Sequence, residues 1–298
     1  MKFDRTLELH SERIKRMAKI PYSRREALPQ GRTFLAATRL SSPKSCCRIL
    51  QKRTSLLLTI LPCLFLLVGF SFAIAQTAEI IEIGNFSSLR AGSDFSSTWK
   101  PLTFKKVKQH TRYSLVADNG VVVVKALSNS SASGLIRKVE INPKTHPVVT
   151  WRWKVTKIYA KGDVTKKKGD DYPARIYITF KYDPDKAEFF EKIKYEIAKT
   201  LYGEYPPVAA LNYIWASNAP EGTIVPNPYT DQAMMIAVES GAQKLNNWVE
   251  EVRNIYQDYK KAYGEEPPLI SGVAIMTDSD NTKESAVSFF GDIVFRKK

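Results

Sequence analysis

Residues 149–155 read VTWRWKV, and this short stretch decides the fold class. Apolar residues alternate here with polar ones, Val149, Trp151, Trp153 and Val155 against Thr150, Arg152 and Lys154. A period of two is typical of a strand with one face turned toward a core. The pattern predicts a strand whose two tryptophans are core residues.

Other short apolar segments on both sides predict further strands, at residues 79–83, 121–125, 175–181, 273–276 and 293–295. In segment 175–181 we expect Ile176, Ile178 and Phe180 to point inward, and Arg175, Tyr177 and Thr179 to point outward. Clusters of Gly, Pro, Asn and Asp separate the strands, as in Asp118-Asn119-Gly120. Together they favour a mainly β fold, an antiparallel β-sandwich of the jelly-roll or carbohydrate-binding-module kind.

Two helices are expected beside the sandwich. Apolar residues recur every four positions at Phe189, Ile193, Ile197 and Leu201, and this pattern ends at Gly203. A second face consists of Trp248, Val252, Ile255, Tyr259 and Tyr263, with Asn246 or Asn247 as the N-cap. Gly264 closes that helix and Pro267-Pro268 blocks its continuation.

The first 75 residues differ in composition from the rest of the chain. They hold 14 basic and 4 acidic residues, whereas residues 76–298 hold 31 and 26, so most of the formal charge of +15 lies near the N-terminus. With a net charge of only +5, residues 76–298 show no electrostatic signature of nucleic-acid binding. We expect residues 1–53 to be a basic N-terminal extension, and we favour a start codon assigned too far upstream over a transit peptide or a basic cytoplasmic tail. Residues 76–298 are expected to form a single β-sandwich domain.

Residues 54–75 resemble an export signal. The apolar run lacks charged residues, follows basic ones and ends in Ala73-Ile74-Ala75, the small-x-small pattern that signal peptidase accepts. Cleavage would release a periplasmic or secreted protein, and a retained segment would anchor it in the inner membrane. We expect no other contact with a membrane. Cys46, Cys47 and Cys63 all precede the cleavage point, so the exported part would contain no disulfide or thiolate site.

Two acidic loops are candidate sites. Asp170 and Asp171 precede the strand that begins at Arg175, and Asp278, Asp280 and Asn281 follow an apolar strand. Carboxylates in such loops can accept hydrogen bonds from sugar hydroxyls or ligate a hard cation such as calcium. The alternative is that these residues only form turns. We assign the possible calcium site to Asp278, Asp280 and Asn281, and expect no other cofactor.

Motifs of this chain, in their order, resemble the bacterial family called domain of unknown function 3047. They include Gly169-Asp170-Asp171-Tyr172, Tyr213-Ile214-Trp215-Ala216-Ser217, Arg253-Asn254, Thr277-Asp278 and Gly291-Asp292-Ile293-Val294-Phe295. The resemblance extends over nearly all of residues 80–295 and implies an exported bacterial protein. It carries no established reaction, so no catalytic residue is transferred from it.

We therefore predict a non-catalytic envelope protein that binds a saccharide or another envelope component. The predicted site consists of Asp170, Asp171, Arg175, Trp215, Arg253, Asp278 and Asp280. Its carboxylates would accept from sugar hydroxyls, its arginines would donate, and Trp215 would stack on a ring. Two alternatives stay open: a glycan hydrolase that uses pairs of Asp residues, and a structural or assembly protein whose acidic loops only stabilise turns.

Overall fold

The computed structural model describes residues 79–95, 97–185, 187–202 and 204–297. The basic extension and the apolar segment 54–75 lie outside these residues, so their predicted roles stay predictions. Among the described residues, no helix has the length and apolar character needed to cross a bilayer.

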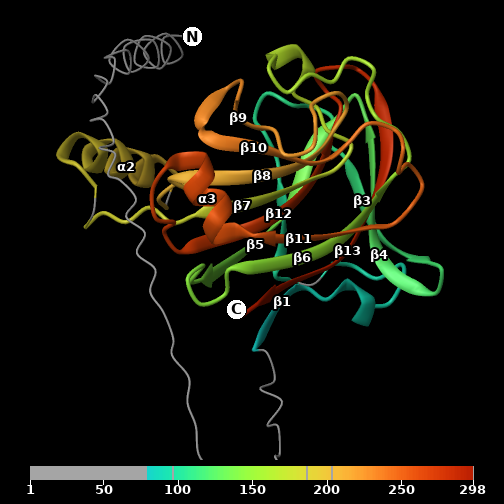
Figure 1. The fold of residues 1–298 in the computed structure, drawn as a ribbon, viewed down its shortest axis with the longest axis horizontal. Coiled ribbons are helices and arrows are strands. Elements are labelled where there is room, and N and C mark those ends of the chain that lie inside the picture. The colour runs from blue at the N-terminus through green and yellow to red at the C-terminus, as the bar shows by residue number, and fades with distance from the viewer. Residues whose placement is uncertain (1–78, 96, 186, 203, 298) are drawn as a thin grey trace, which may run out of the picture. The chain divides into compact units, whose positions relative to one another are not determined.

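The described part of the chain forms two β-sheets that face each other (Figure 1). The six-stranded sheet has the order β11 (Val249–Asn254), β6 (Val148–Val155), β13 (Ser285–Arg296), β4 (Val121–Asn129) and β3 (Arg112–Asp118), and β1 (Ile80–Gly84) also pairs with β13. The seven-stranded sheet has the order β2 (Trp99–Leu102), β5 (Ala132–Ile141), β12 (Ile270–Asp278), β7 (Arg175–Phe180), β8 (Ala209–Ala216), β10 (Thr230–Ser240) and β9 (Ile224–Asn227).

The predicted mainly β sandwich is confirmed, with one departure from antiparallel pairing. β8 and β10 are parallel, because the chain crosses through the short strand β9 before it returns beside β8. The other strand pairs of the described residues are antiparallel.

The core lies between the sheets, and its centre is aromatic. Trp151 and Trp153 point inward from β6, as predicted, and they meet Tyr213 and Trp215 from β8. The Trp153 and Trp215 ring centroids are 6.0 Å apart, and both side chains are fully buried. These contacts join the two sheets across the middle of the sandwich.

Both predicted helices are present, and they lie at the left of the view in Figure 1. The first, α2 (Phe189–Tyr202), agrees with its apolar spacing. The second, α3 (Ile255–Tyr263), begins later than predicted. The cap is Asn254, whose side chain accepts from the Gln257 backbone N at 3.0 Å, and Gly264 ends the helix at a φ of 78°.

The prediction that residues 248–254 begin that helix is wrong, because residues 249–254 form β11 instead. This strand pairs with β6 from Val249 opposite Trp153 to Asn254 opposite Val148. An open edge of β6 offers backbone hydrogen bonds along this whole segment, and tertiary pairing of this kind overrides a helical spacing of apolar residues.

Candidate functional site

The two acidic loops meet on the outer face of the seven-stranded sheet. In β7, Ile176 and Ile178 point into the core, so Arg175 and Tyr177 point away from it. The register places Tyr177 opposite Asn212 of β8, which shares this outer face. Asp278, at the end of the neighbouring strand β12, also lies on it.

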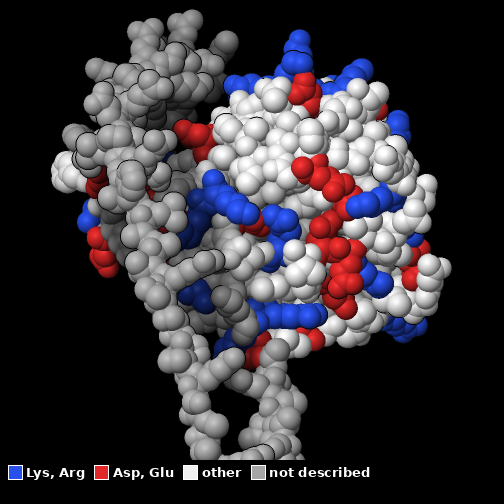
Figure 2. Space-filling model, in the orientation of Figure 1, with Lys and Arg blue, Asp and Glu red and all other residues white. Residues whose placement is uncertain are grey.

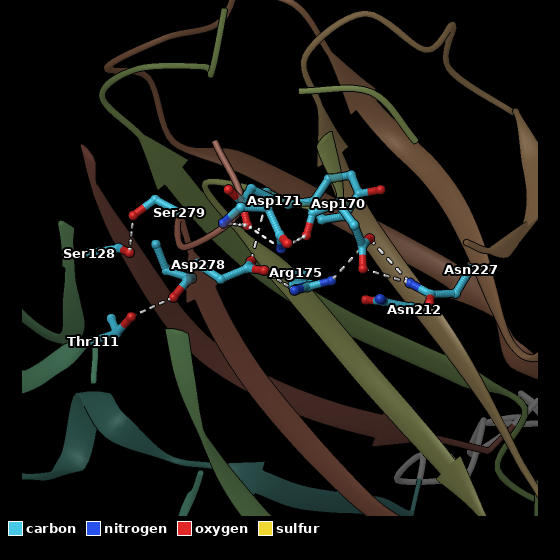
Figure 3. A network of polar contacts seen from close by, with 12 residues as sticks. Thr111, Ser128, Asp170, Asp171, Arg175, Asn212, Asn227, Asp278 and Ser279 are labelled. Atoms are coloured by element: carbon cyan, nitrogen blue, oxygen red, sulfur yellow. Dashed lines mark hydrogen bonds and ion pairs between the residues drawn. The ribbon is translucent and has the colours of Figure 1, made fainter. Parts of the chain in front are cut away.

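Arg175 is the centre of a buried ion-pair network (Figure 3). Its guanidinium pairs with the Asp278 carboxylate, and its Nη1 lies 3.8 Å from Oδ1 of Asp170. The relative exposures are 3% for Arg175, 1% for Asp278 and 6% for Asp170. Arg175 therefore points outward, as predicted, but it is buried rather than solvated.

A loop before β7 covers this face of the sheet. Val164 and Tyr172 pack on Ile214 and Met235 in a small second apolar cluster. The loop closes tightly at Gly169, where a side chain would place its Cβ 2.6 Å from the Asp163 backbone N. The cover removes water from Arg175 and its partners, and so strengthens the ion pairs beneath it.

Asp171 joins the two acidic loops. It is fully buried, and its carboxylate accepts from the backbone N of Asn281 at 3.2 Å, from the Asn281 amide at 3.1 Å and from the backbone N of Thr282. These bonds occupy both carboxylate oxygens. Asp171 therefore has a structural role, as the turn-forming alternative predicts.

Polar atoms without hydrogen-bond partners lie on this outer face at Arg175 and Asn212, which together we call the floor. Within the described residues, Arg175 Nε and Nη1 have no hydrogen-bond partner, and neither has Asn212 Oδ1. The Asn212 amide N donates to the sulfur of Met235, at 3.2 Å. Buried donors and acceptors without partners are costly, so a group that supplies the missing hydrogen bonds would stabilise this floor.

The outer face becomes more exposed from Arg175 toward the far end of β7. Arg175 and Asn212 are buried, whereas Tyr177, Thr179 and Ala210 are half-buried. The Arg175 guanidinium lies over the ring of Tyr177, with its carbon 5.4 Å from the centroid. Burial raises the pKa of Tyr177 to about 12, so its hydroxyl keeps its proton at neutral pH and can donate.

Asp170 lies at the other end of the network. Its carboxylate accepts from the Asn227 amide at 3.0 Å and 3.1 Å, which ties it to β9. Burial raises the pKa of Asp170, and the neighbouring Arg175 opposes this shift. Burial also raises the pKa of Asp278, again against the effect of Arg175.

Three carboxylates could share a cation. Asp171, Asp278 and Asp280 each offer an oxygen atom, and these atoms lie within 4.8 Å of one another. Asn281, which we predicted as a ligand, instead accepts from the Tyr229 hydroxyl at 3.0 Å. The charge of the Arg175 guanidinium already neutralises part of this group, which disfavours a divalent ion.

We therefore expect calcium to leave the thermal melting midpoint of the full-length protein unchanged. Melting curves in calcium and in EDTA, with magnesium as the matched control, measure this directly. A midpoint that rises with calcium but not with magnesium would instead make the three carboxylates a calcium site, because a ligand of the folded state alone raises the midpoint.

Trp215 does not belong to this face. Successive residues of a strand alternate sides, so Asn212 and Ile214 point outward and Trp215 points into the core. Its indole N donates to the Gly241 backbone O at 3.1 Å. The interpretation of Trp215 as a ring that stacks on sugars is therefore wrong, because its faces are covered by core side chains.

Arg253 also lies elsewhere, on the inner side of the edge strand β11. It makes a two-point ion pair with Asp258 of α3, at 2.8 Å and 3.0 Å. The Tyr213 hydroxyl donates to the same Asp258 carboxylate at 2.9 Å. This arrangement holds α3 against the sheets, and Arg253 is not part of the outer-face network.

Sequence reasoning missed Tyr177, Asn212 and Asn227. The signal for Asn212 was present, because it interrupts an otherwise apolar strand, and a buried amide needs a polar partner. Asn227 carried no such signal, because only the fold of the β9–β10 hairpin brings it to Asp170.

A family model described as "Protein of unknown function (DUF3047)" matches residues 97–294, well over half of the 298-residue chain. The chain belongs to this family. The suspected resemblance is thus confirmed, and the outer-face network of this DUF3047 protein lies entirely within the matched residues. No curated protein matches the sequence.

Solved structures similar to this DUF3047 protein include the K2 cleaved adhesin domain of Lys-gingipain, at 12% identity and a TM-score of 0.34, covering 72% of this chain and 97% of that one. The K3 domain from Porphyromonas gingivalis W83 has 10% identity, a TM-score of 0.31 and coverages of 73% and 100%. The carbohydrate recognition domain of Emp47p has 10% identity, a TM-score of 0.35 and coverages of 72% and 94%. TM-scores this low carry no ligand over to this chain.

Proposed function

We propose that this protein is a non-catalytic binding protein of the bacterial envelope, and that it binds a saccharide on the outer face of its seven-stranded sheet. The observation that supports this most is the set of buried polar atoms without partners at Arg175 and Asn212. The resemblance of residues 54–75 to an export signal supports the envelope as its location.

The chemistry of the floor suits hydroxyl groups. Hydroxyl groups can accept from Arg175 Nε and Nη1 and donate to Asn212 Oδ1, so a ligand that carries hydroxyls has the chemistry to supply all three missing partners. Tyr177, a half-buried residue whose ring lies against the Arg175 guanidinium, adds an aromatic side chain with a hydroxyl. An aromatic face beside fixed polar groups is a common way for a protein to bind a sugar ring.

Binding accounts for this geometry better than hydrolysis does. A glycosidase needs two carboxyl groups that reach the scissile bond from opposite sides. Here Asp170 and Asp278 are buried, and both are paired with the same Arg175 guanidinium. Both carboxylate oxygens of Asp171 already accept hydrogen bonds from the loop after β12. Asp170 and Asp278 position the arginine. We therefore expect a saccharide to bind without being hydrolysed.

The proposal predicts that Arg175→Lys weakens saccharide binding by at least about tenfold, the equivalent of about 1.4 kcal/mol. Lysine keeps the charge beside Asp278 but lacks the planar fork of donors. The measurement is calorimetric titration of the full-length protein with hexasaccharides of glucose, xylose, N-acetylglucosamine and galacturonate.

Arg253→Lys is the matched control, because it makes the same change at another Asp-paired arginine outside the outer-face network. It should bind like the wild type. The proposal fails if none of the four hexasaccharides binds the wild type, or if both arginine variants lose binding equally.

A further inference from the structure

A basic cavity adjoins the outer-face network. It has a volume of about 320 Å³ and is lined by Lys106, Lys108, Lys283, Ser130 and Asp280, among others. In Figure 3 the network runs from Ser128 and Ser279 at one end to Asp170 and Asn227 at the other. The cavity lies at the Ser128 end, because Ser130 follows in the turn between β4 and β5.

Three positive charges meet one negative charge in this cavity. Lys106, Lys108 and Lys283 are exposed, and within the described residues none of them forms an ion pair. Exposed lysines normally spread apart to reduce their repulsion, so three that face one hollow favour the entry of an anion.

The backbone holds two of the lining residues in an unusual conformation. Ser130 and Lys283 have φ values of 48° and 61°, in the left-handed region that non-glycine residues rarely adopt. The Ser130 N donates to the Glu284 O at 2.9 Å, and the Lys283 N donates to the Ser279 O at 3.0 Å. Surrounding hydrogen bonds thus fix both residues at the cavity, as is common where a side chain must be held in place for a ligand.

Asp280 connects the cavity to the network. It lines the cavity, and its carboxylate lies within 4.8 Å of those of Asp171 and Asp278. Asp278 in turn pairs with Arg175. The basic cavity and Arg175 are therefore connected through two buried carboxylates, those of Asp171 and Asp278.

We propose that the saccharide is acidic, with a carboxylate or sulfate group bound by Lys106, Lys108 and Lys283. This inference rests on the proposed function and adds the chemical class of the ligand. The floor around Arg175 holds more carboxylates than cations and takes the neutral hydroxyls, while the basic cavity takes the charge. The protein would then prefer acidic glycans to neutral ones, because the lysines of the basic cavity attract only a glycan that carries negative charge.

The test compares hexagalacturonate with its carboxyl-reduced neutral counterpart on the full-length protein. The triple variant Lys106→Gln, Lys108→Gln, Lys283→Gln should bind hexagalacturonate about tenfold more weakly, since each exposed pair contributes modestly, and its affinity for the neutral hexamer should not change. Raising the salt concentration should remove the preference of the wild type for the acidic hexamer.

The control variant Lys192→Gln, Lys194→Gln, Lys199→Gln makes the same change of charge on α2 and should bind like the wild type. If wild type binds both hexamers equally and loses both in Arg175→Lys, the acidic class is overturned while the proposed function stands. If sodium sulfate raises the melting midpoint of the wild type more than that of the triple lysine variant, and by as much as hexagalacturonate does, the cavity is a site for free anions and this inference fails. If the wild type binds one of the other three hexasaccharides but not hexagalacturonate, this inference fails while the proposed function stands, and if none of the four binds, both fail.

Discussion

Asp278→Ala is expected to lower the free energy of unfolding by about 3–5 kcal/mol, because it leaves the buried Arg175 guanidinium without its closest counter-charge. Arg175 is 3% exposed and Asp278 1% exposed, so water cannot replace the lost carboxylate. Asp170, at 3.8 Å from Arg175, compensates only in part. Urea denaturation of the full-length protein measures the loss.

Asp163→Ala is the matched control, because it removes a carboxylate from an ion pair whose lysine is 73% exposed. The expected loss there is below about 1 kcal/mol. The double variant Arg175→Met, Asp278→Leu should recover much of the stability of Asp278→Ala, because it removes both charges together. Equal losses in Asp278→Ala and Asp163→Ala would contradict the buried ion pair.

The second large effect is a decrease in the stability of the fold as the pH rises, and it comes from a pair of glutamates between the sheets. Glu251 points inward from β11 beside Trp151, and Glu239 of β10 lies beside Trp215 of β8. Both carboxyl groups are buried, and each has one oxygen without a hydrogen-bond partner among the described residues. Burial, followed by the nearby charge of Glu239, raises the pKa of Glu251 to about 7.

The folded state therefore keeps a proton on Glu251 that the unfolded chain releases near pH 4.5. This contribution to stability is complete below pH 4.5 and is lost as the pH rises through about 7, a loss of about 3 kcal/mol. Two nearby cations lower the pKa of Glu251 and so oppose this shift. One is Lys244, which pairs with Glu239 at 2.5 Å, and the other is Arg253, which lies on β11 with Glu251.

Urea denaturation at intervals between pH 4.5 and 8 measures this loss. Glu251→Gln cannot titrate, so its stability should vary less with pH over this range than that of the wild type. Parallel pH profiles of the two proteins would show that Glu251 is ionised throughout and would contradict the raised pKa.

Much of the fold could be predicted because its strands carry local signals. The alternation around Trp151 and Trp153 and the spacing of the α2 residues depend only on nearby residues. The error at β11 arose because an apolar spacing that fits a helix also fits an edge strand, and only the open edge of β6 decides between them. The parallel pairing of β8 with β10 depends on contacts between distant segments and leaves no local pattern.

For the candidate site, the residue types were easier to predict than their partners. Asp170, Asp171, Arg175, Asp278 and Asp280 do come together, because their loops lie at neighbouring ends of β7 and β12. Trp215 was misplaced because the face to which a strand residue points depends on register with the opposing sheet. Figure 2 shows acidic side chains in a band beside patches of Lys and Arg, a distribution that net charge alone does not reveal.

The most direct test of the outer-face site is hydrogen–deuterium exchange of the full-length protein with each of the four hexasaccharides. The account predicts that at least one of them slows exchange in residues 163–172 and 227–230, which cover Arg175 and hold Asp170. Unchanged exchange with all four, or protection confined to β11 and α3 around Arg253, would contradict it.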